Sequence, residues 1–175
     1  KAAAGGDKLG QFLLGCAYGL GQGGLAKNWA LAKEWYEKAA AQGRALSMQA
    51  LGGLYKKGGP GLTQDHVTAV EWYRKGVEAG DKKYAQCSLG NAFYYGRGVG
   101  KDLDQARSCY QKSADQDYEH AQCALGTMMV RGEGGARDMN AGCALWRSAA
   151  AQGHAKAHTN LDKLSAVLFG AEFSL

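Results

Sequence analysis

Proline and long apolar runs are scarce in this chain. It has 1 proline among 175 residues and no apolar stretch near the length of about 20 residues that a helix needs to cross a bilayer. It shows no N-terminal signal segment either, but it begins at Lys1 rather than at an initiator methionine. Apolar residues make up 46% of the sequence, which excludes a disordered or fibrous chain and suffices for the core of about one domain.

Charge of one sign is also scarce. The formal net charge of +5 comes from 21 basic and 16 acidic residues that are scattered along the whole sequence. Proteins that bind nucleic acid normally carry a basic run, or a basic stripe beside aromatic residues, and neither is present here. The sequence therefore predicts no nucleic-acid partner.

Cysteine occurs 5 times, and an odd number cannot form a complete set of internal disulfides. The cysteines have no fixed spacing that would mark pairs: Cys16, Cys87, Cys109, Cys123 and Cys143. This pattern favours small apolar core residues over a disulfide framework.

Glycine is abundant, with 27 residues, and it recurs in register. Four Leu-Gly dipeptides are each followed, three residues after the glycine, by an aromatic residue or a methionine. Their leucines, spaced by 37, 38 and 36 residues, are Leu14, Leu51, Leu89 and Leu125, and Leu161 follows after another 36 residues. Periods of this size are typical of stacked helical pairs, which usually bind another macromolecule on an extended surface.

The first helix of each repeat is expected to bury a face centred on the leucine. Residues four before and four after the leucine share that face. They are the small residues Ser47, Ala85, Ala121 and Ala157 before it, and Tyr18, Tyr55, Phe93 and Met129 after it.

Two sets of glycines have structural roles in this pattern. A glycine inside a helix costs about 1 kcal/mol, so its recurrence after the leucine predicts the close approach of a second helix. These glycines are Gly15, Gly52, Gly90 and Gly126. Glycines seven residues past the leucine suit the left-handed position that ends a helix, and they are Gly21, Gly58, Gly96 and Gly132.

A second helix is predicted in each repeat. It begins after a residue whose side chain can accept hydrogen bonds from the first turn, namely Asn28, Asp65, Asp102 or Asp138. In its body an alanine and an aromatic residue at i and i+3, such as Ala32 and Trp35, are expected to share the buried face. It closes on small residues and a turn, as in Ala39-Ala40-Ala41-Gln42-Gly43.

These residues resemble the Sel1-like repeat, a relative of the tetratricopeptide repeat. The loop is clearest in Gly96-Arg97-Gly98-Val99-Gly100-Lys101-Asp102. The resemblance implies an all-α, right-handed α-solenoid of stacked helix-turn-helix repeats whose first helices line the concave side. It implies one domain over 1–175: 1–7 end a truncated upstream repeat, 155–175 form a C-terminal capping helix, and the repeats span about 8–44, 45–81, 82–118 and 119–154.

Three motifs suggest chemistry but fit a structural role better. The Gly19–Gly24 segment has dinucleotide-loop spacing, yet that loop follows a strand and this segment follows a predicted helix. The Gly98–Lys101 segment looks like part of a phosphate loop, but Asp102 would repel phosphate. His154, His158 and Asp162 form a helical stripe that can hold zinc or simply solvate the last repeat. We expect no catalytic residue, metal or cofactor, and no enzyme.

A partner-binding surface follows from helix geometry. At 100° per residue, positions two and five past the leucine, and five before it, point away from the buried face. On the concave side these positions predict a partner-binding groove that contains Lys56, Tyr84, Asn91, Tyr94, His120 and Thr127. Aromatic residues dominate binding hot spots, although Tyr84 and Tyr94 can equally wedge between neighbouring first helices.

The predicted function is that of a protein–protein interaction scaffold or adaptor, with another protein as its partner and no membrane insertion. The family resemblance allows a bacterial envelope signalling adaptor or a cognate, immunity-type inhibitor of a secreted toxin, and it favours the periplasm or envelope over the cytoplasm. The alternative is a β-lactam-binding or β-lactam-hydrolysing enzyme like the cysteine-rich Sel1-like proteins. Those carry a regular cysteine pair in each repeat, which this sequence does not reproduce.

Overall fold

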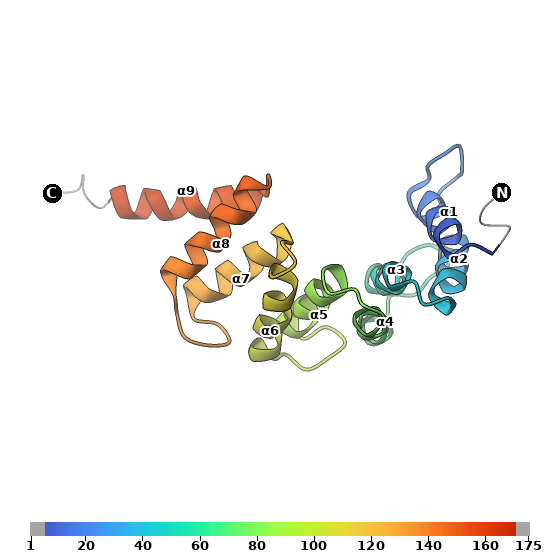
Figure 1. The fold of residues 1–175 in the computed structure, drawn as a ribbon, viewed down its shortest axis with the longest axis horizontal. Helices are drawn as coiled ribbons and strands as arrows, with labels where there is room; N and C mark the ends of the chain where they lie inside the picture. The colour runs from blue at the N-terminus through green and yellow to red at the C-terminus, as the bar shows by residue number, and fades with distance from the viewer. Residues whose placement is uncertain (1–5, 171–175) are drawn as a thin grey trace. The chain divides into compact units, whose positions relative to one another are not determined.

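The computed structural model describes residues 6–170, and within this range the chain forms an all-α repeat solenoid without a strand (Figure 1). The predicted fold class is confirmed at this level. Residues 1–5 of the predicted upstream remnant (1–7), and residues 171–175 of the predicted capping helix (155–175), lie outside the described residues. Asp7 caps α1, which begins at Lys8. The helices are α1 (Lys8–Leu20), α2 (Trp29–Ala41), α3 (Ala45–Lys57), α4 (His66–Glu78), α5 (Tyr84–Tyr95), α6 (Leu103–Ala114), α7 (Glu119–Arg131), α8 (Met139–Ala151) and α9 (Ala155–Gly170).

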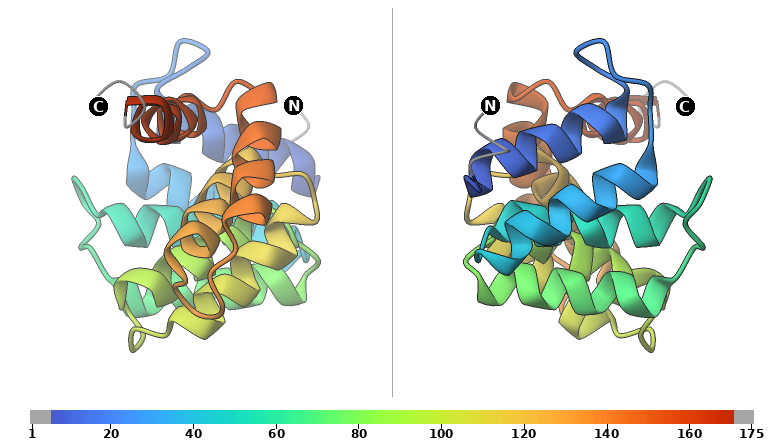
Figure 2. Two further views of the ribbon diagram at one scale, coloured as in Figure 1. Left: turned by 90° about the vertical axis from the view of Figure 1, so that its left-hand side faces the viewer. Right: turned by 90° about the vertical axis from the view of Figure 1, so that its right-hand side faces the viewer.

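The chain divides into two compact units, Lys1–Lys101 and Asp102–Leu175. In the first unit, helices α1 to α4 lie side by side in chain order, and α5 packs mainly against α4 (Figures 1 and 2). In the second unit, α6 packs on α7, α7 on α8, and α8 on α9. Each described helix therefore buries a face against its neighbour in the sequence, as expected for helical hairpins.

The second helices begin at the four predicted N-caps. Asn28 and Asp102 accept a hydrogen bond from the backbone N–H three residues on, at 3.0 and 2.9 Å. Asp138 accepts the same bond at 2.9 Å, and Asp65 accepts from both Val67 N and Thr68 N. These bonds satisfy amides that have no partner inside the helix, which fixes where each second helix starts.

Three of the four predicted C-cap glycines have the left-handed conformation: Gly21, Gly96 and Gly132, with φ of 71°, 66° and 71°. Gly58 differs, because its φ of 60° is combined with a ψ of 167°. The chain after Gly58 runs directly into a tight turn in which Gly59 and Leu62 exchange two backbone hydrogen bonds of 2.7 and 2.9 Å. The prediction for Gly58 is therefore wrong, since the turn requires an extended exit from the helix.

The core of each first helix forms largely as predicted. Leu51, Leu89 and Leu125 are buried, and the four small residues before the leucines are completely buried. Leu14 and Leu161 are half-buried. Of the residues four past the leucine only Phe93 is buried, whereas Tyr18, Tyr55 and Met129 are half-buried.

The second helices bury a different aromatic residue from the predicted one. Tyr36, Tyr73, Tyr110 and Trp146 are buried, and each lies four residues after a small residue rather than three. Trp35 and Trp72 are half-buried, with a lysine ammonium 4.3 and 4.4 Å from the ring centre. The i+3 assignment is therefore wrong. In α2, α4 and α8 the i+4 ring faces the glycine of the neighbouring first helix, whereas the i+3 tryptophans of α2 and α4 pack against a lysine side chain.

Three of the four glycines inside the first helices, Gly15, Gly52 and Gly126, make the close approach that was predicted. A Cβ atom at Gly52 would lie 2.5 Å from Cδ1 of Tyr73 and 2.9 Å from the backbone oxygen of Ala69. Gly15 faces the ring of Tyr36 in the same way, and Gly126 faces Trp146. The aromatic rings of α2, α4 and α8 thus occupy the volume that a side chain would need.

Cysteines serve as core residues in the second unit. Cys123 and Cys143 are buried in one cluster with Trp146, Ala149 and Ala157. Burial raises the pKa of the Cys123 thiol above its ordinary value. Raised pKa and burial make a thiol inert, which agrees with the predicted role as apolar filler.

Candidate functional site

The first unit contains a cleft between α3, α4 and α5. Its inner part has a volume of about 160 Å³, and it continues into a shallow outer part of about 560 Å³. The two parts share Lys56 from the end of α3, His66 from the start of α4, and Arg97 from the loop after α5. Because the helices run side by side, residues far apart in sequence meet at this one position.

The inner wall of the cleft combines apolar and polar groups. Ala69, Val70 and Ala92 provide its apolar surface, and Tyr73 and Ser88 join α4 to α5 through their side chains. Burial raises the pKa of Tyr73 to about 12, so its hydroxyl stays protonated at neutral pH. The cleft therefore offers neutral hydrogen-bonding groups at its inner end.

Arg97 reaches the cleft because of the glycine that follows it. Gly98 has a φ of 76° and sits directly against the backbone carbonyl of His66, in a position that leaves no room for a Cβ atom. This contact holds the loop after α5 on the first turn of α4. The Arg97 guanidinium then stacks over the exposed Tyr95 ring, 4.9 Å from its centre.

The lysines at the end of α3 are positioned by the following loop. Gln64 donates a hydrogen bond of 2.9 Å to the backbone oxygen of Lys56, which satisfies one of the last carbonyls of α3. The Lys57 ammonium lies 5.3 Å from the centre of the Trp29 ring. Both lysines line the outer part of the cleft and are exposed.

The cleft is cationic. Among the residues that line either part there is no aspartate or glutamate, whereas Lys56, Lys57 and Arg97 are all present. Within the described part of the chain, no carboxylate forms an ion pair with any of these three side chains. The positive charges of the cleft are thus available for an external group.

The structure brings together two of the residues predicted for the partner-binding groove. Lys56 and Asn91 both line the cleft, and Asn91 donates from Nδ2 to the backbone oxygen of Cys87 at 3.0 Å. Tyr84, the first residue of α5, is 38% exposed but lies outside the cleft lining. Tyr94 is half-buried and packs edge-on against Tyr95, with 4.9 Å between the ring centres.

The other two predicted residues belong to the second unit. Thr127 is half-buried, donates a hydrogen bond of 2.8 Å to Cys123 O and lies 3.3 Å from Trp146 Nε1. Its hydroxyl therefore joins α7 to α8. His120, at the start of α7, is exposed and contacts His154, which precedes α9.

The two histidines form a directed hydrogen bond. His154 Nδ1 accepts from the backbone N–H of Ala157 at 3.3 Å and so caps α9. We therefore assign the proton of His154 to Nε2, which donates to Nδ1 of His120 at 2.9 Å. Burial, followed by the proximity of His120, lowers the pKa of His154 below its ordinary value, while Glu119 acts against this shift and Lys156 adds to it.

The lowered pKa predicts that the second unit loses stability on mild acidification. The unfolded chain takes up a proton on His154 near its ordinary pKa of about 6.5, whereas the folded chain resists protonation. This stabilisation is complete above about pH 6.5 and is lost as the pH falls towards the lowered pKa of the folded state. Urea unfolding at about pH 7.5 and about pH 5.5 measures the difference.

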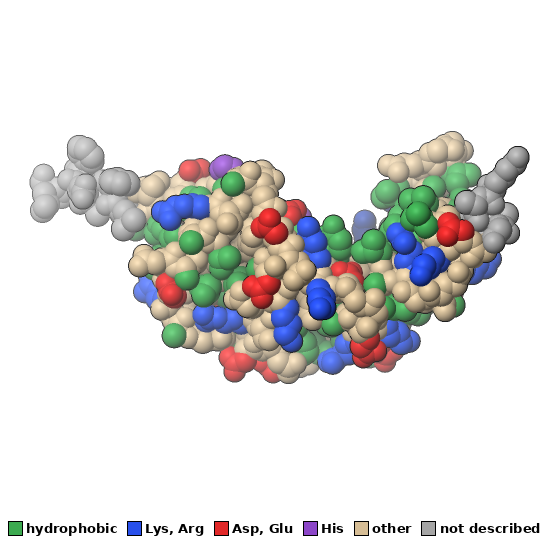
Figure 3. Space-filling view, viewed as in Figure 1, with side chains coloured by type: hydrophobic (Ala, Val, Ile, Leu, Met, Phe, Trp, Pro, Cys, Tyr) green, Lys and Arg blue, Asp and Glu red, His purple; other side chains and the backbone are tan. Residues whose placement is uncertain are grey.

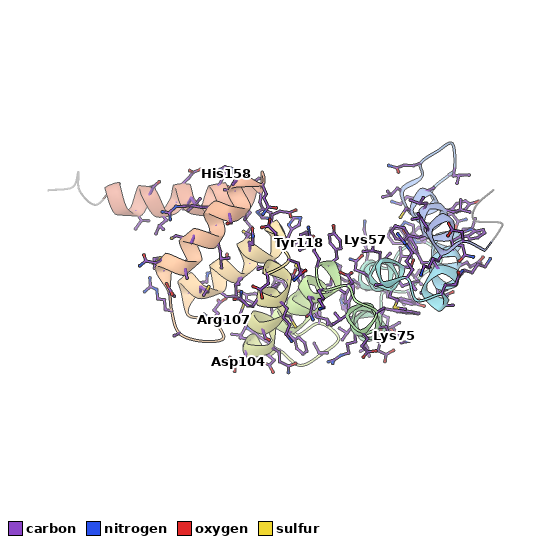
Figure 4. All side chains as sticks on the ribbon, in the orientation of Figure 1. Lys57, Lys75, Asp104, Arg107, Tyr118 and His158 are labelled. Carbon is purple, nitrogen blue, oxygen red and sulfur yellow. The ribbon has the colours of Figure 1, made fainter. Side chains whose placement is uncertain are left out.

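Two variants separate this effect from other titrations. His154→Asn keeps a side-chain acceptor for the cap but does not titrate, so its stability is expected to depend less on pH than that of the wild type. His158→Gln removes an exposed histidine of α9 (Figure 4) and is expected to keep the wild-type pH dependence. An unchanged pH dependence in His154→Asn would show that the histidine pair has no such role.

The other predicted motifs have structural positions. The Gly19–Gly24 segment begins in the last turn of α1 and continues into the loop after it. His154 turns towards His120, and within the described residues no group of three His, Cys, Asp or Glu side chains is placed to hold a metal ion. No helix within the described residues has the length and hydropathy of a membrane span.

Sequence reasoning missed His66, Tyr95 and Arg97, which complete the cleft. The helical-face rule considers the first helices only, whereas His66 starts a second helix and Arg97 lies in a loop. The signal that could have found Arg97 is the Gly96-Arg97-Gly98 segment, because a residue between two glycines of positive φ is held where the backbone packs closely.

The fold and the cationic cleft define a helical repeat protein, and a family profile gives the particular repeat. The profile described as Sel1 repeat matches residues 8–43, 45–81, 83–118 and 119–154. The chain therefore belongs to the Sel1 repeat family. Repeats of this family commonly mediate protein–protein interaction, and their scaffold is generally non-catalytic. Comparison with curated proteins gave no match.

Solved structures agree with this assignment. The chain is 34% identical to c5321, a protective antigen of uropathogenic Escherichia coli with an SLR fold, at a TM-score of 0.80, covering 94% of this chain and 35% of that one. It is 31% identical to a Sel1 repeat protein from Oxalobacter formigenes, again at a TM-score of 0.80, covering 89% and 61% of the two chains. The cysteine-rich protein B of Helicobacter pylori, at 23% identity and a TM-score of 0.53, covers 65% of this chain and 86% of that one, and it shares the fold. This chain thus spans about a third of c5321 and about three-fifths of the Oxalobacter protein.

Proposed function

We propose that this chain is an interaction scaffold that binds a segment of a partner protein in the cleft between α3, α4 and α5. One observation carries the proposal. Lys56 and Asn91, chosen from helix geometry as partner-binding residues, line the same cleft as His66 and Arg97. Tyr84 and Tyr94 lie on α5 outside the cleft lining and would add to the contact on that helix.

The size and composition of the cleft favour a protein segment over a small molecule. Small-molecule sites usually have volumes of about 300–1,000 Å³. The inner part of this cleft has only about 160 Å³, enough for a single side chain, and it opens into the wide outer part. Exposed tyrosine and arginine, here Tyr95 and Arg97, are residue types enriched in binding hot spots.

His120 and Thr127 lie in the second unit and already contact other residues there. The hydroxyl of Thr127 is used between α7 and α8, and His120 is paired with His154. We propose that His120 contacts a partner through its exposed edge. We propose that Thr127 supports this part of α7 through its contacts with Cys123 and Trp146. Neither residue is needed for binding in the cleft of the first unit.

Within this general role we propose an adaptor or an immunity-type inhibitor that acts at the bacterial envelope. The likeness to c5321, a protective antigen present in uropathogenic Escherichia coli strains, supports the bacterial part of this proposal. We do not propose β-lactam chemistry, since the five cysteines do not reproduce the regular pair in each repeat that the cysteine-rich Sel1-like proteins carry.

Site-directed photo-crosslinking tests the proposed function. A benzophenone amino acid at position 91 is expected to form an adduct with another protein in the native host cells. The same amino acid at position 75 is the control, because Lys57 and Lys75 lie on opposite sides of the α3–α4 hairpin (Figure 4). Adducts of equal yield from both positions, or none from position 91, would contradict binding in the cleft. A Tyr84→Ala, Tyr94→Ala double variant is expected to reduce the adduct from position 91.

A further inference from the structure

We infer that the segment bound in this cleft is acidic, with carboxylates that pair with Lys56, Lys57 and Arg97. This inference rests on the proposed function and specifies the chemistry of the partner. Three cations line one cleft without any carboxylate in its lining, in a chain whose net charge is only +5. On the face drawn in Figure 3, by contrast, basic and acidic side chains are interspersed over both units.

The acidic residue that directly adjoins the cleft lining in sequence, between Gln64 and His66, is already occupied. Asp65 precedes His66, but its Oδ1 accepts from Val67 N and Thr68 N, and its Oδ2 accepts from Thr68 Oγ1 at 2.6 Å. These bonds hold the pKa of Asp65 below its ordinary value and keep its carboxylate at the first turn of α4. Asp65 therefore caps the helix and leaves the cations of the cleft to an external carboxylate.

The arginine is arranged to recognise a carboxylate. Its guanidinium stacks on the Tyr95 ring, and the loop that carries it is fixed by the contact of Gly98 with the His66 backbone. Stacking on a ring face leaves the N–H edge of a guanidinium to bind a carboxylate with two hydrogen bonds. A fixed donor loses little conformational freedom on binding, which favours this pairing.

The inner cleft adds a requirement for the residue that enters it. Its apolar wall of Ala69, Val70 and Ala92 accommodates carbon atoms. Tyr73 and Ser88 add neutral polar side chains to the lining. A short side chain of mixed character therefore fits inside while its acidic neighbours reach Lys56 and Arg97 at the rim. A segment in which acidic and small residues alternate meets both conditions.

The arrangement suits a protein segment better than a nucleic acid. Proteins that bind duplex DNA tightly make about 6–10 phosphate contacts, whereas this cleft offers three cations besides His66. Base stacking would need an accessible ring face, and the Tyr95 ring is occupied by Arg97.

Fluorescence anisotropy with defined probes tests the inference on the full chain. The probe is a fluorescein-labelled peptide of alternating glutamate and alanine, and the reference is the peptide with glutamine in place of glutamate. We expect the glutamate peptide to bind at least about tenfold more tightly at low salt and to lose this advantage at about 1 M salt, where charges are screened beyond about 3 Å. Equal affinity for the two peptides would overturn the inference.

Charge-removing variants locate the binding. Lys56→Gln and Arg97→Gln are each expected to weaken binding of the glutamate peptide about threefold to fivefold, and the double variant about tenfold or more. The matched control is Lys75→Gln, which removes an exposed lysine on the other side of the hairpin and is expected to leave the affinity unchanged. Thermal unfolding of each variant checks that it is folded. Equal losses of affinity in the three single variants, Lys56→Gln, Arg97→Gln and Lys75→Gln, would overturn the inference.

Two competitors decide between sources of negative charge. An oligodeoxythymidine that displaces the glutamate peptide at a lower concentration than unlabelled peptide would overturn the inference in favour of nucleic acid. Displacement of the glutamate peptide by millimolar sulfate at constant ionic strength would overturn the inference in favour of a simple anion site. If the glutamate peptide does not bind while the adduct at position 91 still forms, the inference of an acidic partner is wrong and the proposed function is not. If both fail, the proposed function is wrong as well.

Discussion

Gly52→Ala is expected to destabilise the protein by about 2 kcal/mol, although alanine is the better helix former by about 1 kcal/mol. The new methyl group would lie 2.5 Å from Cδ1 of Tyr73 and 2.9 Å from the backbone oxygen of Ala69. Tyr73 cannot move aside, because it is 2% exposed and its hydroxyl is bonded to Ser88. Helices α3 and α4 would have to separate, and the cleft that they form would change shape.

The neighbouring residue gives the matched control. A Cβ atom at Gly53 meets nothing within 4 Å, and Gly53 lies in the same helix. Gly53→Ala is therefore expected to stabilise the protein by about 0.5–1 kcal/mol through helix propensity alone. Urea unfolding followed by circular dichroism measures both variants. Stabilisation by both substitutions would show that Tyr73 yields and that close helix packing is not the reason for this glycine.

Gly98→Ala is expected to cost about 3 kcal/mol and to weaken peptide binding. The residue has a φ of 76°, and a Cβ atom would collide with the His66 carbonyl and lie 2.8 Å from Val67 N. These are backbone atoms of the first turn of α4, so no side-chain rotation relieves the contact. The loop would lift away and carry Arg97 out of the cleft, which is why stability and binding should fall together.

Gly100→Ala is the control for Gly98→Ala, since Gly100 belongs to the same loop but its Cβ position is open. It is expected to change stability by less than about 0.5 kcal/mol and to leave binding of the glutamate peptide unchanged. A Gly98→Ala variant with normal stability would contradict the packing of this loop on α4. Normal stability combined with weakened binding would show that Gly98 serves only to place Arg97 in the cleft.

Much of the fold was predictable because its signals are local. Each N-cap, such as Asp138, bonds an amide three residues away, and the buried leucines repeat with the period of a helical pair. The errors occurred where a neighbouring element chooses between local options. Tyr36 rather than Trp35 is buried because it faces α1, and Gly58 leaves its helix extended because the next residues form a tight turn.

The candidate site was predictable only in part. Lys56 and Asn91 follow from the direction of side chains on a first helix, which 100° per residue determines. His66 and Arg97 meet in the cleft because the loop after α5 packs on the start of α4. No period in the sequence encodes this contact. The contact between Gly98 and the His66 carbonyl joins two residues that are 32 positions apart in the sequence.

The sequence by itself determined the repeat, the starts of the second helices, three buried leucines and the membership of the Sel1 repeat family. The helix starts and the buried leucines depend on hydrogen bonds and side-chain directions within about one helical turn, and the repeat is visible because these local signals recur. The tertiary structure alone decided that Lys56, His66 and Arg97 share a cationic cleft and that His120 pairs with His154. The cleft arises where the loop after α5 packs on the start of α4, with Gly98 against the His66 carbonyl. Such a contact depends on the fit of two separately folded elements, which no local pattern in either element determines.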